Sequence, residues 1–257
     1  MKIPSGLLSA LTQEDTLFVK HILDLYELSE KRAMPVFSAF MDMGRRAVCE
    51  EVLSALKLNG CFYGGFDGAE RTVLGFYPDF LEPELSDFPI KCVKFSFRKA
   101  DKLSHRDILG SLMAMQIKRE MVGDIIISEG CAEAMVYDTI ASEGESICKI
   151  GRIGVSASMI DAPDIMPERN FRLISGTVPS MRIDCIAALA MNVSREKASA
   201  ALRSEKIMLN YRTVSDNDRA VSEGDILSVR GYGKFRIGKI GGETKKGRIH
   251  LTIEKYE

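Results

Sequence analysis

Residues 181–203 read MRIDCIAALAMNVSREKASAALR, and the architecture of the C-terminal part of the chain follows from this stretch. Apolar residues recur at helical spacing from Ile183 to Ala190, which predicts a short amphipathic helix. Residues 191–193 interrupt the pattern, and Ser194 is a good N-cap for a second helix. We therefore expect two short helices that pack at an angle.

Strands are expected to follow the helix pair. Ile249, Leu251 and Ile253 alternate with polar neighbours, as in a strand with one buried face. Gly231-Tyr232-Gly233 is expected to form a tight turn between two of the strands. The predicted strands are 207–209, 225–230, 234–237 and 249–254.

The middle of the chain, residues 90–160, shows a β-α-β-β-α-β order, which is typical of the ferredoxin-like fold. The expected elements are 90–97, 104–115, 124–128, 132–136, 138–148 and 153–160. RNA-recognition-motif domains share this order, but the K/R-G-F/Y-G/A-F-V-x-F/Y signature that would place stacking aromatics is missing. Phe95 and Phe97 share a strand face and are interpreted as core residues. The sequence leaves RNA contact by this domain open.

The N-terminal part is expected to be a small α/β unit. Apolar residues at helical spacing predict a helix that starts near Thr12 or Asp15 and a second helix that Asn59-Gly60 would end, and a strand is expected at 71–77. The fold class is therefore α+β. The predicted division is an N-terminal domain at 1–85, a central domain at 86–162, a linker at 163–180 and a C-terminal domain at 181–257. The linker could include a short strand at 171–178.

The charge of the chain is unevenly distributed. The formal net charge is -1, but residues 181–257 hold 15 Lys and Arg against 10 Asp and Glu, or +5, whereas the remainder holds 20 against 26, or -6. A basic module joined to an acidic body indicates that one end meets a polyanion, although a solvated charged surface would give the same count.

Other compositional features exclude several classes of protein. No apolar run reaches the roughly 18 residues that a membrane-spanning helix needs, and residues 1–10 show no leader pattern, so we expect a cytoplasmic protein. The six cysteines contain no C-x-x-C pair and are interpreted as buried reduced thiols. The three histidines lie far from one another and from zinc-site spacing, so we expect no metal and no cofactor.

Positive side chains in the C-terminal module occupy positions suited to phosphate. Arg195 and Lys197 follow a helix N-cap, and Arg230 and Lys234 flank a glycine turn. We expect these groups to share one positive surface with Lys245. The predicted RNA-binding residues are Arg182, Ser194, Arg195, Lys197, Lys206, Asn210, Arg212, Arg230, Lys234, Lys245, Lys246 and Arg248.

The order of segments in this module resembles the S-four (alpha-L) RNA-binding domain. The segments that carry the likeness are 181–184, 192–198, 207–210 and 223–235, which together extend over the module. The resemblance implies that the helix pair and the adjoining loop form an RNA-binding face. Met181 and Ile183 stand where a Leu-Arg-Leu opening is usual, which is a conservative departure.

A second resemblance runs nearly end to end. The blocks GGFDGAER at 64–71, LSHRDILG at 103–110, IKRE at 117–120 and TKKGR at 244–248 look like those of the bacterial YlmH family. This likeness implies an N-terminal unit, an RNA-recognition-motif-like middle and a C-terminal S-four domain. It also implies a ribosome-associated protein that contacts rRNA or tRNA on large subunits obstructed by peptidyl-tRNA, without catalysis. We expect a monomer when the protein is free.

Two motifs that could indicate catalysis or RNA binding have simpler interpretations. In Ser104-His105-Arg106-Asp107, adjacent side chains diverge on a helix, so Ser104 and Asp107 are interpreted as a helix cap rather than part of a triad. Gly151-Arg152-Ile153-Gly154 copies the G-x-x-G of KH domains, but an ordinary turn is favoured. Arg106 and Arg119 remain secondary candidates for RNA contact.

The main alternative function is RNA modification. S-four domains often deliver pseudouridine synthases to RNA, and Arg182-Ile183-Asp184 superficially matches the residues around the catalytic aspartate of those enzymes. The long catalytic sheet that should follow is missing from the sequence. A targeting adaptor that retains the domain is the other alternative.

Overall fold

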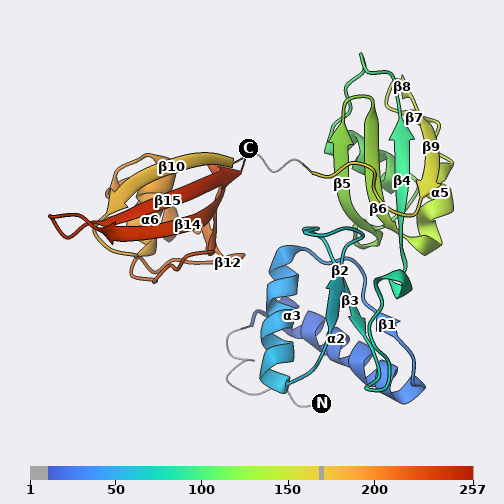
Figure 1. The fold of residues 1–257 in the computed structure, drawn as a ribbon, viewed down its shortest axis with the longest axis horizontal. Helices are drawn as coiled ribbons and strands as arrows, with labels where there is room; N and C mark the ends of the chain where they lie inside the picture. The colour runs from blue at the N-terminus through green and yellow to red at the C-terminus, as the bar shows by residue number, and fades with distance from the viewer. Residues whose placement is uncertain (1–10, 168–170, 257) are drawn as a thin grey trace. The chain divides into compact units, whose positions relative to one another are not determined.

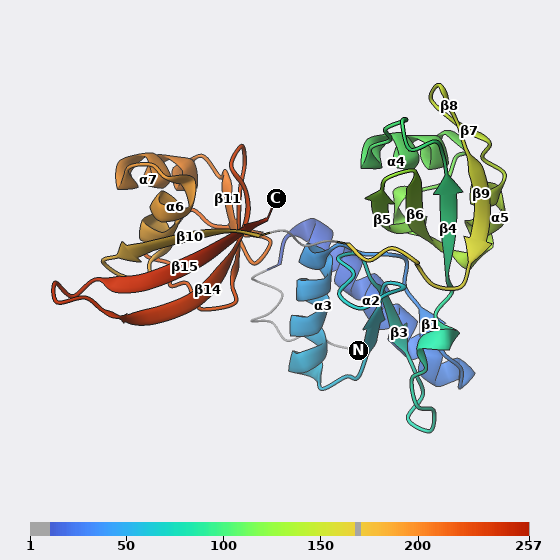
Figure 2. The ribbon, with the colours of Figure 1, turned by 45° about the horizontal axis from the view of Figure 1, so that its top comes forward.

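The computed structural model describes residues 11–167 and 171–256 and divides the chain into two compact units, Met1–Pro167 and Glu168–Glu257 (Figures 1 and 2). Both units contain helices and antiparallel sheets, so the α+β class is confirmed. Residues 1–10, where no leader was expected, lie outside the described ranges.

From residue 11 on, the N-terminal part of the first unit contains two capped helices and a small sheet. Thr12 caps the first helix and forms a capping box with Asp15, and its hydroxyl accepts a hydrogen bond from the Asp15 amide at 3.1 Å. The second helix ends earlier than Asn59-Gly60, because Lys57 adopts a left-handed conformation (φ 55°) that closes it. The elements are α2 (Gln13–Arg32), β1 (Val36–Phe37), α3 (Met43–Leu56), β2 (Cys61–Tyr63) and β3 (Val73–Phe76), with sheet order β1-β3-β2.

The central subdomain has the expected β-α-β-β-α-β order. Its sheet order is β5-β6-β4-β9, which is that of the split β-α-β arrangement, and both helices pack on one face. Phe95 is buried in the core under these helices, as expected. The elements are η1 (Leu85–Asp87), β4 (Ile90–Ser96), α4 (His105–Ala114), η2 (Arg119–Met121), β5 (Val122–Ser128), β6 (Cys131–Tyr137), η3 (Asp138–Ile140), α5 (Ala141–Glu145), β7 (Lys149–Ile150), β8 (Ile153–Gly154) and β9 (Ser156–Ile160).

The predicted boundary at residue 85 lies inside the first unit. Phe40 and Phe66 from the N-terminal part share one buried cluster with Cys92, Ile126 and Met135 from the central sheet. Apolar side chains from both parts are therefore withdrawn from water together, which stabilises them as one compact body.

A single arginine also joins the two parts of this unit. Arg71 Nε donates to the carbonyl of Val122 at 3.0 Å, and its Nη2 donates to the carbonyl of Phe40 at 3.3 Å. Burial lowers the pKa of Arg71, and the nearby Arg119 lowers it further. The guanidinium thus forms hydrogen bonds with backbone carbonyl groups on both sides of the expected boundary.

The second unit is a six-stranded antiparallel sheet with two helices on one face (Figure 2). The linker expected at 163–180 is shorter than predicted, because Phe171–Val178 forms a strand that pairs along its whole length with β15. The elements are β10 (Phe171–Val178), α6 (Ile183–Met191), α7 (Arg195–Arg203), β11 (Ile207–Leu209), β12 (Arg212–Thr213), β13 (Ile226–Val229), β14 (Gly233–Glu243) and β15 (Ile249–Tyr256), in the order β10-β15-β14-β13-β11-β12.

Strand β14 is longer than the expected 234–237. It continues through a glycine-rich stretch to Glu243 and stays paired with β15 by means of two register shifts, between Ile237 and Ile240 and between Ile240 and Glu243. The turn at 244–248 consequently lies at the far end of a long hairpin.

The cysteines differ in part from the expectation. All six are free thiols, but only Cys49, Cys92 and Cys185 are buried, and Cys148 is exposed. Burial raises the pKa of Cys49 and of Cys92 to about 12, so both thiols are protonated at neutral pH. None of the helices within the described ranges has the length and apolar character required to traverse a bilayer.

Candidate nucleic-acid interface

The helix pair of the second unit forms as predicted. Helix α6 ends at Asn192 in a left-handed conformation (φ 54°), and Ser194 then caps α7 by accepting a hydrogen bond from the Lys197 amide at 3.4 Å. Ser194 and Lys197 are exposed in the first turn of this helix, next to Arg195. The side chain of Ser194 is therefore engaged as a cap, whereas Lys197 projects into solvent.

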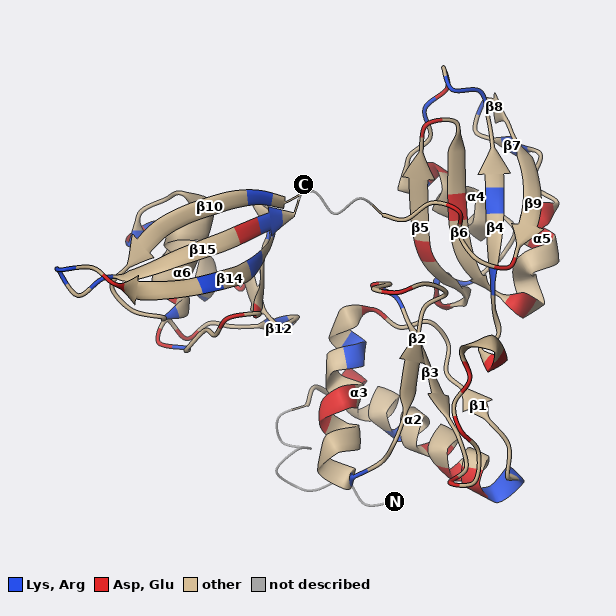
Figure 3. Cartoon of the chain, viewed as in Figure 1, with Lys and Arg blue, Asp and Glu red and all other residues tan. Residues whose placement is uncertain are grey.

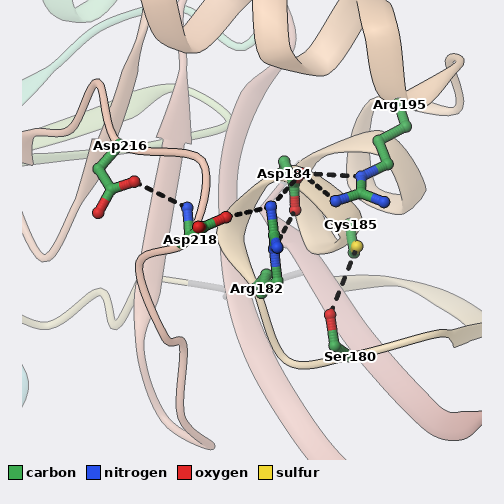
Figure 4. Close-up of polar contacts among 7 residues, drawn as sticks. All are labelled: Ser180, Arg182, Asp184, Cys185, Arg195, Asp216 and Asp218. Atoms are coloured by element: carbon green, nitrogen blue, oxygen red, sulfur yellow. Dashed lines mark hydrogen bonds and ion pairs between the residues drawn. The ribbon is translucent and has the colours of Figure 1, made fainter.

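Arg182 and Arg195 converge on a buried carboxylate rather than on open solvent (Figure 4). Asp184 is 2% exposed, and its Oδ2 lies 2.7 Å from Arg195 Nη2 and 3.2 Å from Arg182 Nη2. Arg182 also pairs with Asp218. These four groups carry balanced charge, so the expectation that both arginines are chiefly phosphate ligands is corrected.

The pKa of Asp184 reflects two opposing effects. Burial alone would raise the pKa of this carboxyl group, but hydrogen bonds from Arg195, Cys185 and Arg182 outweigh the burial and lower the pKa below its ordinary value. The carboxylate is thus ionised at neutral pH and holds the start of α7 against the first turn of α6.

A positive surface lies at one end of the six-stranded sheet, where β11 begins and β13 ends. Arg230 donates its amide to the carbonyl of Lys206 at 2.9 Å, which brings these two exposed residues together. The register Phe235↔Lys255 and Lys255↔Arg172 adds one cation from β15 and one from β10, in the row next to Lys234 of β14. We call this surface the basic edge, and Figure 3 shows Lys and Arg on the strands that compose it. Its members are Arg172, Lys206, Arg212, Arg230, Lys234 and Lys255.

Aromatic rings accompany these cations. Lys234 Nζ lies 4.9 Å from the ring centroid of Tyr256 and 5.4 Å from that of Tyr211. Tyr256 in turn packs edge-on against Phe171, with centroids 5.0 Å apart. The sequence prediction omitted these rings, Arg172 and Lys255. Phe171 and Arg172 fall within the expected linker, and Lys255 and Tyr256 follow the strand expected at 249–254. The short strand that the sequence allowed at 171–178 was the signal that could have placed Arg172 in the sheet.

Asn210 has an internal role that the sequence did not predict. Its Nδ2 donates to Asp225 at 2.9 Å, and its Oδ1 accepts from the Ile226 amide at 2.9 Å. With a φ of 47°, Asn210 shapes the turn between β11 and β12. We therefore correct its assignment from RNA ligand to turn residue.

The remaining predicted cations lie far from the basic edge. Lys245 and Lys246 are exposed at the tip of the β14–β15 hairpin, whereas Arg248 donates to the side chain and carbonyl of Thr177 at 2.9 and 2.6 Å. Lys234 and Lys245 stand at opposite ends of β14, roughly 30 Å apart at the usual rise of a strand. The expected single positive surface is therefore wrong, because β14 extends past 237.

Arg106 and Arg119, the secondary candidates for RNA contact, lie in different environments. Arg106 is exposed in the first turn of α4. Arg119 is half-buried, donates to the carbonyl of Val122, and has a pKa lowered by burial. The predicted cap is confirmed, since Ser104 donates its amide and hydroxyl to Asp107 Oδ2 at 2.8 and 2.6 Å. Arg119 is thus a structural residue, and Arg106 remains available to a ligand.

Two comparisons establish the family of this chain. Residues 83–164 match the family model described as "Putative RNA-binding domain in YlmH". The chain is also 30% identical over 250 residues to "Ribosome-associated protein quality control protein P2" of Bacillus subtilis (strain 168), which covers 95% of this chain and 96% of that protein. The chain belongs to the YlmH family. A solved structure, "Cell division protein ylmH from Streptococcus pneumoniae", matches this YlmH protein with a TM-score of 0.51 and 25% identity over 58% of this chain and 93% of that chain.

The family model matches the central subdomain rather than the C-terminal unit. It covers 83–164, whereas every RNA-binding residue predicted from the sequence lies beyond 180. The "Putative RNA-binding domain" of the family model thus covers a part of the chain for which the sequence supplied only the secondary candidates Arg106 and Arg119.

No group of three or more His, Cys, Asp or Glu side chains within 11–167 and 171–256 is arranged to hold a metal ion. The carboxylates at the helix pair are instead engaged with arginines. What the described site offers chemically is cationic and aromatic contact.

Proposed function

We propose that this YlmH protein binds rRNA or tRNA on the ribosome and acts as a quality-control factor on large subunits that carry peptidyl-tRNA. The observation that carries the proposal is the match over 95% of the chain to a protein named for ribosome-associated quality control. Because that match includes both units, the role is proposed for the whole chain rather than for one module.

The geometry of the second unit supports an RNA contact of the S-four kind. Its helix pair and antiparallel strands follow the order that the resemblance implies, and the basic edge gathers six cations at one end of the sheet. Lys and Arg side chains neutralise phosphates and release counterions, and tyrosine rings stack on unpaired bases. The basic edge and its rings therefore suit folded RNA better than an uncharged partner.

We further propose that binding, not catalysis, is the activity of this chain. The pseudouridine synthase alternative requires an aspartate that substrate can reach. Asp184 is instead 2% exposed and paired with Arg182 and Arg195. Mapping modified nucleotides in bacteria with and without the gene tests this alternative, because a modification that disappears with the gene would favour an enzyme.

Sedimentation of cell lysate through sucrose gradients tests the binding proposal. At low salt the protein should migrate with large-subunit fractions, and high salt should release it, because phosphate contacts weaken as counterion concentration rises. Recovery only at the top of the low-salt gradient would contradict the proposal. A variant with Lys20, Lys31 and Arg32 replaced by alanine serves as a control, since these exposed cations lie on α2.

A further inference from the structure

The sheet face that is opposite the helices of the central subdomain is covered where it adjoins the N-terminal part. Cys92, Ile126 and Met135 on this face are only 1%, 5% and 1% exposed, and they pack against Phe40 and Phe66 of the N-terminal part. RNA-recognition-motif domains stack bases on aromatic rings of this face. Here the part of that face formed by Cys92, Ile126 and Met135 is withdrawn from solvent, so bases cannot stack on it. Ser96 and Ser156, near the other end of the strands, are exposed.

The segment after β9 covers more of the same face, and Figure 1 shows it crossing in front of the sheet. The buried carboxylate of Glu133 accepts a hydrogen bond from the Ile165 amide at 2.9 Å and lies 3.4 Å from Lys94 Nζ. Lys94 also pairs with Asp164 of this segment. The cation on the face is thus neutralised by two carboxylates, so this part of the face offers no unpaired positive charge to RNA.

One end of the sheet remains open. The register Ser96↔Cys131, Ser96↔Ser156 and Ser128↔Cys131 places an end of all four strands side by side. The connections at 97–104, 129–130 and 149–155 leave from this end, which points away from the N-terminal part in Figures 1 and 2. We call this surface the loop end.

Positive charge predominates at the loop end. Two of its three carboxylates are engaged within it, because Asp101 accepts from Arg98 Nε at 2.9 Å and Asp107 caps α4 through Ser104. Glu129 is the third. The exposed cations are Arg98, Lys99, Lys102, Arg106, Lys149 and Arg152.

The β7–β8 hairpin adds an approachable backbone to this surface. Gly151 has a φ of 58°, and a Cβ placed on Gly151 or on Gly154 would meet no described atom within 4 Å. Open glycines let a phosphate come close to the main chain, as in the G-x-x-G loop of KH domains. Arg152 stands between these two glycines.

We propose that the central subdomain binds the phosphodiester backbone of RNA through the loop end, with Lys99, Lys102 and Arg106 on one side and Lys149 and Arg152 on the other. The inference deepens the proposed function and rests on it. It assigns an RNA contact to the region of the family match, 83–164, at a surface distinct from both the sheet face and the basic edge.

Filter binding of the full-length chain to purified large-subunit ribosomal RNA tests the proposal. A loop variant (K99A/K102A/R106A) should bind roughly 10-fold or more weakly at about 0.1 M salt, and its log-log salt slope should be smaller by about 2. A hairpin variant (K149A/R152A) should lose about 1.4 of slope. The control (K20A/K31A/R32A) removes as many exposed charges from α2 and should bind like the wild type.

The outcomes separate this inference from the proposed function. If the wild type itself fails to retain RNA, the proposed function fails. If the wild type binds but the loop variant matches the control, or if Lys94→Ala weakens binding more than the loop variant does, the loop end is not the contact. If the loop variant keeps wild-type affinity for RNA but no longer sediments with ribosomal particles, the loop end contacts an acidic protein partner, and the RNA assignment is overturned. The charge-preserving K99R/K102R variant should keep wild-type binding, which distinguishes lost charge from misfolding.

Discussion

Arg195, the first residue of α7, is bound to Asp184 in the first turn of α6, with Nε and Nη2 lying 2.8 and 2.7 Å from one carboxylate oxygen. The second terminal nitrogen of Arg195 points away from Asp184 in Figure 4. The ion pair therefore orders the helix pair and leaves one edge of the guanidinium for a ligand. Arg195 thus has a structural role in the helix pair.

Replacing Asp184 by asparagine should lower the free energy of unfolding by about 2 kcal/mol, because a neutral amide loses charge-assisted hydrogen bonds to two arginines in a buried site. Urea denaturation followed by circular dichroism measures the change. Asp218→Asn is the matched control, and since Asp218 is 68% exposed its effect should stay within about 0.5 kcal/mol. Equal stability of Asp184→Asn and wild type would refute the structural role of this ion pair.

The contribution of Asp184 should depend on pH with a definite sign. The pKa of Asp184 in the folded protein lies below its ordinary value of 3.8. Its stabilising effect is therefore fully present above that value and is lost as the pH falls through the lowered pKa. The stability difference between wild type and Asp184→Asn should be constant from about pH 5 to 8 and should shrink below about pH 4. A difference that grows on acidification would contradict this assignment.

Arg71→Lys should destabilise the first unit by about 1–2 kcal/mol. A lysine keeps the charge but cannot reproduce the fork that reaches the carbonyls of Val122 and Phe40. Thermal unfolding followed by circular dichroism measures the effect. Arg98→Lys, at a side chain that is 84% exposed, should leave the unfolding temperature unchanged. If both variants behave alike, Arg71 does not fasten the two parts of the unit.

The basic edge and the hairpin tip should contribute to RNA affinity independently. They lie at opposite ends of β14, roughly 30 Å apart, which is well beyond a Debye length of about 8 Å at physiological salt. K206A/R230A and K245A/K246A should each weaken binding several-fold, and their combination should weaken it by the product of the two factors. A combined effect clearly different from that product, measured by filter binding, would mean that one RNA feature bridges both surfaces.

Local patterns predicted the elements that depend on neighbouring residues. The helix that starts at Thr12, the cap formed by Ser104 and Asp107, and the strand order of the central sheet all follow from spacing or from capping chemistry. These features depend on contacts within a few residues or on a hydrophobic period, which a single sequence displays directly.

The sequence did not predict contacts between residues that are far apart along the chain, because these contacts depend on strand pairing and tertiary packing. The strand expected at 234–237 stops before the glycines at 238, 241 and 242, yet pairing with β15 carries β14 past them to Glu243. That extension separates Lys245 from Lys234. The pairing of Asp184 with Arg195 and the burial of the central sheet under Phe40 and Phe66 depend on tertiary packing, which no local pattern encodes.

The salt dependence of binding to purified large ribosomal subunits tests the central claim most directly. Wild-type affinity should fall steeply with salt, and K206A/R230A should reduce the log-log slope by about 1.4, or about 0.7 for each lost phosphate contact. An affinity that does not change with salt, or identical slopes for wild type and K206A/R230A, would contradict electrostatic RNA binding at the basic edge.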